Sequence, residues 1–253
     1  MSDYNKWNTA ARGGYAGQTA AVDAGLRAYM LRVYNYMAAA VALTGVVAWL
    51  CFQNAVVTNE AGTITGLTSF GQMLLGGYTP IVLMLATLGL VFFISFRIHT
   101  LQYTTALALF MFYAALLGAA LTSVLVAYTG ASVARVFFIS AASFGALSLY
   151  GYTTQRDLSA MGSFLIMGLF GIIIASLVNI FLKSSGLDWA ISVIGVGVFA
   201  GLTAYDTQRI KEMYDSMDDD GTMGRKAIMG ALSLYLDFIN LFLMLLRVVG
   251  DRR

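Results

Sequence analysis

Long apolar segments alternate along this chain with short polar stretches. Seven of the segments are long enough to cross a membrane, because a helix needs about 20 mostly apolar residues to traverse a hydrocarbon core about 30 Å thick. They cover approximately residues 31–52, 79–97, 103–128, 133–152, 162–182, 188–208 and 227–248. The pattern predicts an all-α integral membrane protein, folded as a seven-helix transmembrane bundle.

The polar ends divide the chain into three predicted parts. These are a cytosolic N-terminal tail (1–28), a seven-span domain (29–250) and a short C-terminal tail (251–253). The first apolar segment is too long for the core of a signal peptide, and no small-residue cleavage site follows it, so we expect it to remain as an anchor. A long loop of about residues 53–78 is expected on the outer side.

The seventh segment is ambiguous because Asp237 lies near its middle. A charge deep in lipid is costly, so residues 227–248 either span the membrane or form a re-entrant hairpin that returns to the side it came from. Three basic residues at the chain end, Arg247, Arg252 and Arg253, favour the hairpin, since basic residues accumulate on the cytosolic side. Both alternatives stay open at this point.

The distribution of basic residues favours a cytosolic N-terminus. With seven spans, five basic residues fall outside, namely Arg135, Lys183, Arg247, Arg252 and Arg253. Ten fall inside, namely Lys6, Arg12, Arg27, Arg32, Arg97, Arg156, Arg209, Lys211, Arg225 and Lys226. The inside excess predicts this orientation.

Composition excludes several function classes. Hydrophobic residues make up 59% of the chain and charged residues 11%, too few charges to cover a water-soluble surface. Lys and Arg number 15 against 13 Asp and Glu, so there is no basic excess for nucleic acid, and we expect no such partner. Cys51 cannot form an internal disulfide, and His99 is the only histidine, so we expect no zinc, haem or other cofactor.

Two acidic residues lie where water does not readily reach them. Asp237 is about ten residues into the seventh segment, and Asp206 lies in the last turns of the sixth. An ionised carboxylate inside a membrane has to be paired, protonated or facing a wet cavity, which makes it a functional candidate. Ser233 and Asn240, at i−4 and i+3 from Asp237, form a polar stripe on the same helix face.

Two arginines allow interpretations in which Asp206 and Arg97 have no role in a mechanism. Arg209 follows Asp206 by three residues, and an interfacial ion pair between them would explain that acid without any mechanism. Arg97 ends the second segment and either snorkels to the interface or pairs with a buried carboxylate.

A short internal repeat, called the internal echo below, occurs at two predicted helix ends that lie 53 residues apart. Residues 151–156 read GYTTQR and residues 204–209 read AYDTQR. A shared interfacial terminus explains most of the likeness, with Tyr at headgroup level and Arg near the negative end of the helix dipole. It does not explain why Asp206 replaces the neutral Thr153.

Five runs of the sequence together resemble the Bax inhibitor-1 family of membrane proteins, in its bacterial branch. They are LRVYNYMAAAVALTG (31–45), LSLYGYTTQRDLS (147–159), ASLVNIFLKSSG (175–186), FAGLTAYDTQRIKEMY (199–214) and LSLYLDFINLFLMLLR (232–247). The resemblance extends from about residue 27 to the chain end. It implies a bacterial inner membrane protein whose last helix is central and wrapped by the other six.

The resemblance also implies a function, that of a pH-sensitive calcium leak channel. The two key aspartates of the family map onto Asp206 and Asp237, and Arg97 is the candidate for the second-helix arginine that bonds the first of them in the closed state. Elementary chemistry is compatible with this assignment. Two carboxylates facing each other in a low dielectric share a proton more cheaply than both ionise, and Ca²⁺ competes for the same oxygens, with Ser233 and Asn240 as further donors.

Rival classes are weaker or remain open. Tyr205 and Asp206 match the YD of intramembrane aspartyl proteases, but Asp237 lacks their Gly-x-Gly-Asp and Pro80 is the only proline, so we expect no enzyme. A proton-coupled transporter of small solutes uses similar acid pairs. A non-conducting regulator of a membrane protease or other partner would leave both aspartates dispensable. The partners expected otherwise are the lipid bilayer, calcium ions and protons.

Overall fold

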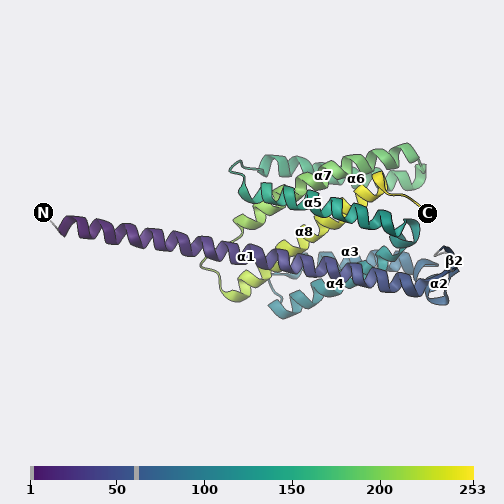
Figure 1. Cartoon of the computed structure of the whole chain (residues 1–253), viewed down its shortest axis with the longest axis horizontal. Coiled ribbons are helices and arrows are strands. Elements are labelled where there is room, and N and C mark those ends of the chain that lie inside the picture. The colour runs from purple at the N-terminus through teal and green to yellow at the C-terminus, as the bar shows by residue number, and fades with distance from the viewer. Residues whose placement is uncertain (1–2, 60–62) are drawn as a thin grey trace.

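The computed structural model describes residues 3–59 and 63–253, with side chains described from residue 23 onward in those ranges. Its helices lie roughly alongside one another, and the termini lie at opposite ends of the molecule (Figure 1). In chain order the elements are α1 (Asp3–Ala55), β1 (Val56–Thr58), β2 (Ile64–Leu67), α2 (Ser69–Leu75), α3 (Thr79–Arg97), α4 (Tyr103–Ala127), α5 (Gly130–Thr153), α6 (Ser159–Leu182), α7 (Ser185–Glu212) and α8 (Asp220–Val249).

Seven helices within the described residues are long and apolar enough to cross a membrane, which confirms the predicted bundle. Three of them, α5, α7 and α8, begin a few residues before the predicted apolar segment because a hydroxyl or carboxylate cap starts them earlier. Thr129 caps α5, Ser184 caps α7 and Asp219 caps α8, each accepting from a backbone N–H of the first turn. In α1 the candidate span begins at Asp23, and the helical backbone reaches back to Asp3 through most of the predicted polar tail.

The connection between α1 and α3 is more ordered than the long loop predicted for residues 53–78. Antiparallel β1 and β2 pair, and α2 follows immediately. Thr68 caps α2 by accepting from the backbone N of Gly71, while its own backbone N donates to the carbonyl of Ala55 at 3.0 Å. The short elements therefore fold back against the end of α1.

Helix α8 is one unbroken helix of 30 residues, about 45 Å long, which excludes the re-entrant hairpin. It contacts α1, α4, α5 and α7, and 67% of its apolar stretch is buried, against at most 44% in any other span. The last helix is therefore the central one.

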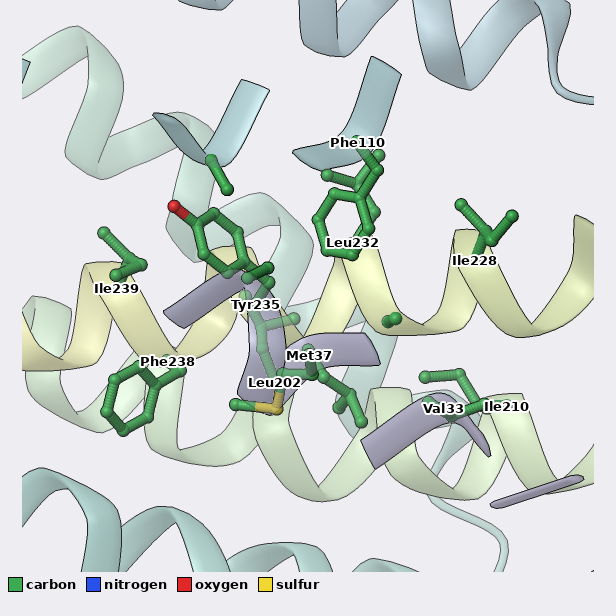
Figure 2. Packing of buried hydrophobic residues seen from close by; sticks show 14 of the residues in the cluster. Val33, Met37, Phe110, Leu202, Ile210, Ile228, Leu232, Tyr235, Phe238 and Ile239 are labelled. Atoms are coloured by element: carbon green, nitrogen blue, oxygen red, sulfur yellow. The ribbon is translucent and has the colours of Figure 1, made fainter. Parts of the chain in front are cut away.

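A buried tyrosine anchors α8 at the middle of the bundle (Figure 2). The hydroxyl groups of Tyr235 and Thr44 are hydrogen-bonded at 2.7 Å, and Thr44 also donates to the carbonyl of Ala114 at 2.9 Å. The rings of Phe110 and Tyr113 meet that of Tyr235 edge-on. These contacts fix α8 against α1 and α4 and satisfy a polar group that would otherwise be costly in an apolar core.

Glycines allow α7 to approach α8 closely. A methyl group on Gly195 would lie 2.8 Å from the sulfur of Met244, and one on Gly230 would lie 2.9 Å from the side chain of Ile210. Small residues at such crossings let the helix backbones pack tightly. The two helices that carry the candidate aspartates are therefore held side by side.

The C-terminal tail is attached to one end of the bundle by hydrogen bonds and ion pairs. The backbone of Asp251 accepts from Thr129 N at 3.1 Å, and its carboxylate pairs with Arg135 at 2.8 Å. Arg247 and Arg252 both lie within 4 Å of Asp188, at 3.8 and 3.9 Å. Two of the three basic residues that favoured a hairpin thus have an acidic partner at this end of the bundle.

Candidate functional site

A cavity of about 660 Å³ lies between α3, α6, α7 and α8, and it contains most of the predicted site. Its polar side is formed by Asp206 and Arg209 of α7 and by Ser233, Asp237 and Asn240 of α8. Leucine, isoleucine and aromatic side chains form most of the remaining wall. The structure therefore brings both aspartates and the predicted polar stripe to one apolar-walled chamber.

Asp237 is the buried member of the acidic pair. Only 5% of its surface is exposed, and its Oδ2 atom has no hydrogen-bond partner among the described residues. Its carboxyl group lies close enough to that of Asp206 for the two groups to interact. A buried carboxylate oxygen without a partner is costly, so a proton or a cation is needed to stabilise it.

Asp206 is half-buried and lies between Asp237 and the C-terminal end of α7. Arg209 is exposed, lines the same cavity and acts on Asp206 through its charge, although no atoms of the two residues come within 4 Å as an ion pair. The plain interpretation of Asp206 as one half of an interfacial ion pair does not account for its contact with Asp237.

The stripe on α8 supplies neutral oxygen atoms. Ser233 and Asn240 are both half-buried and face the cavity. Asn240 donates its Nδ2 to the carbonyl of Leu236 at 2.8 Å, which leaves its Oδ1 available as an acceptor or ligand. The helical spacing read from the sequence thus describes a real face of α8.

Arg97 lies outside this cavity. It is exposed at the end of α3, and it belongs to none of the four ion pairs found among the described residues. Helix α3 packs on α2 and α4 and contributes only Leu88 to the cavity wall. The pairing of Arg97 with Asp206 stays a prediction, and it requires α3 to move relative to the arrangement seen here.

Two cavity residues were not predicted as site residues. Ser176 of α6 faces the cavity, and it is one of three serines in that mostly apolar helix, so the sequence does not single it out. Tyr205 also lines the cavity, and its ring packs where Gly162 of α6 leaves no side chain, so that a methyl group there would lie 2.4 Å from the ring. Tyr205 is thereby part of the α6–α7 contact as well as of the site.

The second copy of the internal echo has a specific role that an interfacial terminus does not require. Gln208 accepts from the backbone N of Leu158 and donates to the carbonyl of Arg156, both at 2.8 Å. Gln155, the matching glutamine of the first copy, is exposed. Gln208 therefore fastens the α5–α6 connection to α7, two residues after Asp206.

The donor set limits what the cavity can bind. In the described part of the chain, no group of three or more His, Cys, Asp or Glu side chains is placed to hold a metal ion. A cation at this site would have two carboxylates, the oxygen atoms of Ser233 and Asn240, and water, whereas Ca²⁺ takes six to eight oxygen ligands. Such a set favours weak, exchangeable binding.

Comparison with known proteins identifies the family. The profile of the family described as "Inhibitor of apoptosis-promoting Bax1" matches residues 26–253. An uncharacterized protein of Rickettsia prowazekii is 49% identical over the whole of both chains. The inner membrane protein YbhL of Escherichia coli is 48% identical over 91% of this chain and 94% of its own, and an uncharacterized protein of Borreliella burgdorferi is 43% identical over 89% and 92%. The chain belongs to the Bax inhibitor-1 family of membrane proteins.

Proposed function

We propose that this protein is a pH-sensitive calcium leak channel of a bacterial inner membrane, with its N-terminus in the cytosol. The observation that supports it best is that the carboxyl groups of Asp206 and Asp237 lie close together at the wall of one cavity between the helices. The location extends to this chain what the name of its relative YbhL states. The proposed orientation places ten of the 15 basic residues on the cytosolic side, where basic residues accumulate.

The pair can respond to pH because it needs a proton. Two neighbouring carboxylates repel each other strongly in a low dielectric, and a shared proton removes that repulsion. Loss of the shared proton leaves Asp206 and Asp237 both charged. The site must then open, take up a cation or recruit a positive side chain.

Calcium is a suitable cation for the deprotonated pair. It prefers hard oxygen ligands, and the carboxylates of Asp206 and Asp237 are joined on the cavity wall by the oxygens of Ser233 and Asn240. Water has to complete the coordination shell. Weak binding suits passage of an ion, which must leave the site as readily as it enters.

Helix α3 is the element best suited to act as the gate. Only 11% of its apolar stretch is buried, and among the described residues its main neighbours are α2 and α4. Movement of α3 towards α7 would bring Arg97 to Asp206 when that acid is ionised, which closes the path. Protonation of Asp206 releases Arg97, so low pH favours the open state.

Calcium flux into liposomes, measured from acidic to alkaline pH, tests the proposal. We expect Asp206→Asn to leak with little pH dependence, because it mimics the protonated acid, and Asp237→Asn to bind calcium more weakly. Asp157→Asn is the matched control, since Asp157 is exposed at the same end of the bundle and Asn keeps its acceptor for the backbone N of Ser159.

The same assay separates the alternatives. If both dyad variants follow wild type at every pH, the aspartates are neither sensor nor site. Absence of calcium flux combined with Asp-dependent proton uptake would favour a proton-coupled transporter of small solutes. A protein that moves neither ion, with or without the aspartates, would be a non-conducting regulator of a membrane protease or other partner.

A further inference from the structure

We propose that a groove between α1 and α5 binds an anionic phospholipid, with the phosphate at Arg27 and one acyl chain lying in the groove. The groove has a volume of about 570 Å³ and is separate from the acidic cavity. The proposal does not depend on whether the protein conducts calcium.

The groove exists because α1 and α5 both pack on α7 and α8 but barely touch each other. Its walls are apolar over most of their length, with Met30 and Leu31 on α1 facing Phe144 and Leu149 on α5. Gly145 widens it, since nothing lies within 4 Å of the position of a methyl group there. An unbranched hydrocarbon chain fits a slot of this shape and polarity.

Positive charge is confined to one end of the groove. Arg27 lines the mouth, is exposed, and belongs to none of the ion pairs found among the described residues. Lys211 adds a second charge at the same end, because its Nζ donates to the carbonyl of Tyr152, a lining residue, at 2.9 Å and lies 5.3 Å from the centre of its ring. A phosphate at this mouth would be attracted by both.

The charge of the groove lies at the depth of a phospholipid headgroup. Arg27 lies four residues before the apolar segment that begins near residue 31, about 6 Å along the helix, at the level where headgroups are found. Tyr34 lies about 10 Å deeper along α1, and its hydroxyl is hydrogen-bonded to that of Ser148. The apolar side chains of Met30 and Leu31 lie between these two levels, so an acyl chain below a phosphate at Arg27 would meet them first.

The other chambers do not have this combination. A smaller groove of about 200 Å³ between α1, α4, α5 and α8 has no charged residue in its lining. The acidic cavity contains Asp206 and Asp237, which would repel a phosphate. Charge complementarity therefore selects the α1–α5 groove as the site for an anionic lipid.

Native mass spectrometry of the detergent-purified protein, titrated with phosphatidylglycerol or phosphatidylcholine, tests the proposal. We expect phosphatidylglycerol to bind more tightly, and Arg27→Gln to weaken it about fivefold, the equivalent of about 1 kcal/mol for one basic residue at a lipid headgroup. Arg27→Lys keeps the charge and should keep most of the affinity. Phosphatidylcholine binding should change little in either variant.

A second pair of variants tests the acyl slot. Gly145→Leu fills the groove without a steric clash and should lower binding of both lipids, whereas Gly171→Leu adds the same side chain to an exposed, uncrowded position of α6 and should leave binding unchanged. Equal affinity for the two lipids in wild type, or no effect of Arg27→Gln, would overturn the proposal. So would equal competition by inorganic phosphate, which would indicate an anion site without a lipid chain.

Discussion

Replacing Gln208 by alanine should destabilise the protein through two broken hydrogen bonds. Gln208 is 8% exposed and Leu158 is 5% exposed, so water cannot replace the lost acceptor at the backbone N of Leu158. A buried N–H left without a partner costs about 1–3 kcal/mol, and the lost bond to the carbonyl of Arg156 adds up to about 1 kcal/mol. We therefore expect a loss of about 2–3 kcal/mol.

Thermal unfolding in detergent, followed by tryptophan fluorescence, measures this loss. For a chain of this size, 1 kcal/mol corresponds to about 2–4 °C, so Gln208→Ala should lower Tm by about 5–10 °C. Gln208→Glu keeps the acceptor for Leu158 N but turns a carboxylate towards the carbonyl of Arg156, and its Tm should be intermediate. Both variants keep the apolar surface of the spans unchanged.

The chain contains its own control for this experiment. Gln155 occupies the matching place in the first copy of the echo but is exposed, so Gln155→Ala should change the stability by less than about 0.5 kcal/mol. If Gln155→Ala and Gln208→Ala unfold at the same temperature, the two hydrogen bonds do not hold the α5–α6 connection. The echo would then be no more than a shared interfacial pattern.

Three further predictions follow from other parts of the molecule. Arg97→Ala should raise the resting calcium leak of liposomes, because a partner of ionised Asp206 is lost, and an unchanged leak at all pH values would leave Arg97 as a snorkelling cation. A C-terminal tag should react with membrane-impermeant reagents only from outside, and labelling from the cytosol would reverse the proposed orientation. Hydrogen bonds from Thr222 and Gly221 lower the pKa of Asp219. The ionised cap therefore stabilises α8 at pH values above the usual pKa of an aspartate, and this stabilisation is lost as the pH falls through the lowered pKa of Asp219. Asp219→Ala should accordingly lower Tm at pH 7 but not at pH 2, while Asp219→Asn should retain most of the cap at both.

The transmembrane helices could be predicted from the sequence because burial in lipid imposes one simple requirement on each of them. A run of about 20 apolar residues has few other ways to satisfy its backbone. The β1–β2 hairpin and α2 escaped because they are short, lie outside the apolar runs and depend on contacts such as that of Thr68 with the end of α1. The spacing of apolar residues cannot predict hydrogen bonds of this kind between separate elements.

The candidate site was partly predictable for the same reason. Asp206, Asp237, Ser233 and Asn240 stand out because polar groups are rare in apolar helices, and helical spacing groups those of α8 on one face. Which helices face one another is not contained in that spacing. The contribution of Ser176 from α6 and the distance of Arg97 from the cavity therefore became apparent only in the folded bundle.

The central position of α8 constrains how the protein is made. This helix follows the other six spans along the chain, so they enter the membrane before the element around which they pack exists. Until then, Thr44 lacks the hydroxyl of Tyr235 and the inner faces of α1, α5 and α7 lack one of their main neighbours. Completion of the bundle thus waits for the synthesis of α8, and a chain cut short before residue 220 would present incompletely packed helices to the quality-control proteases of the membrane.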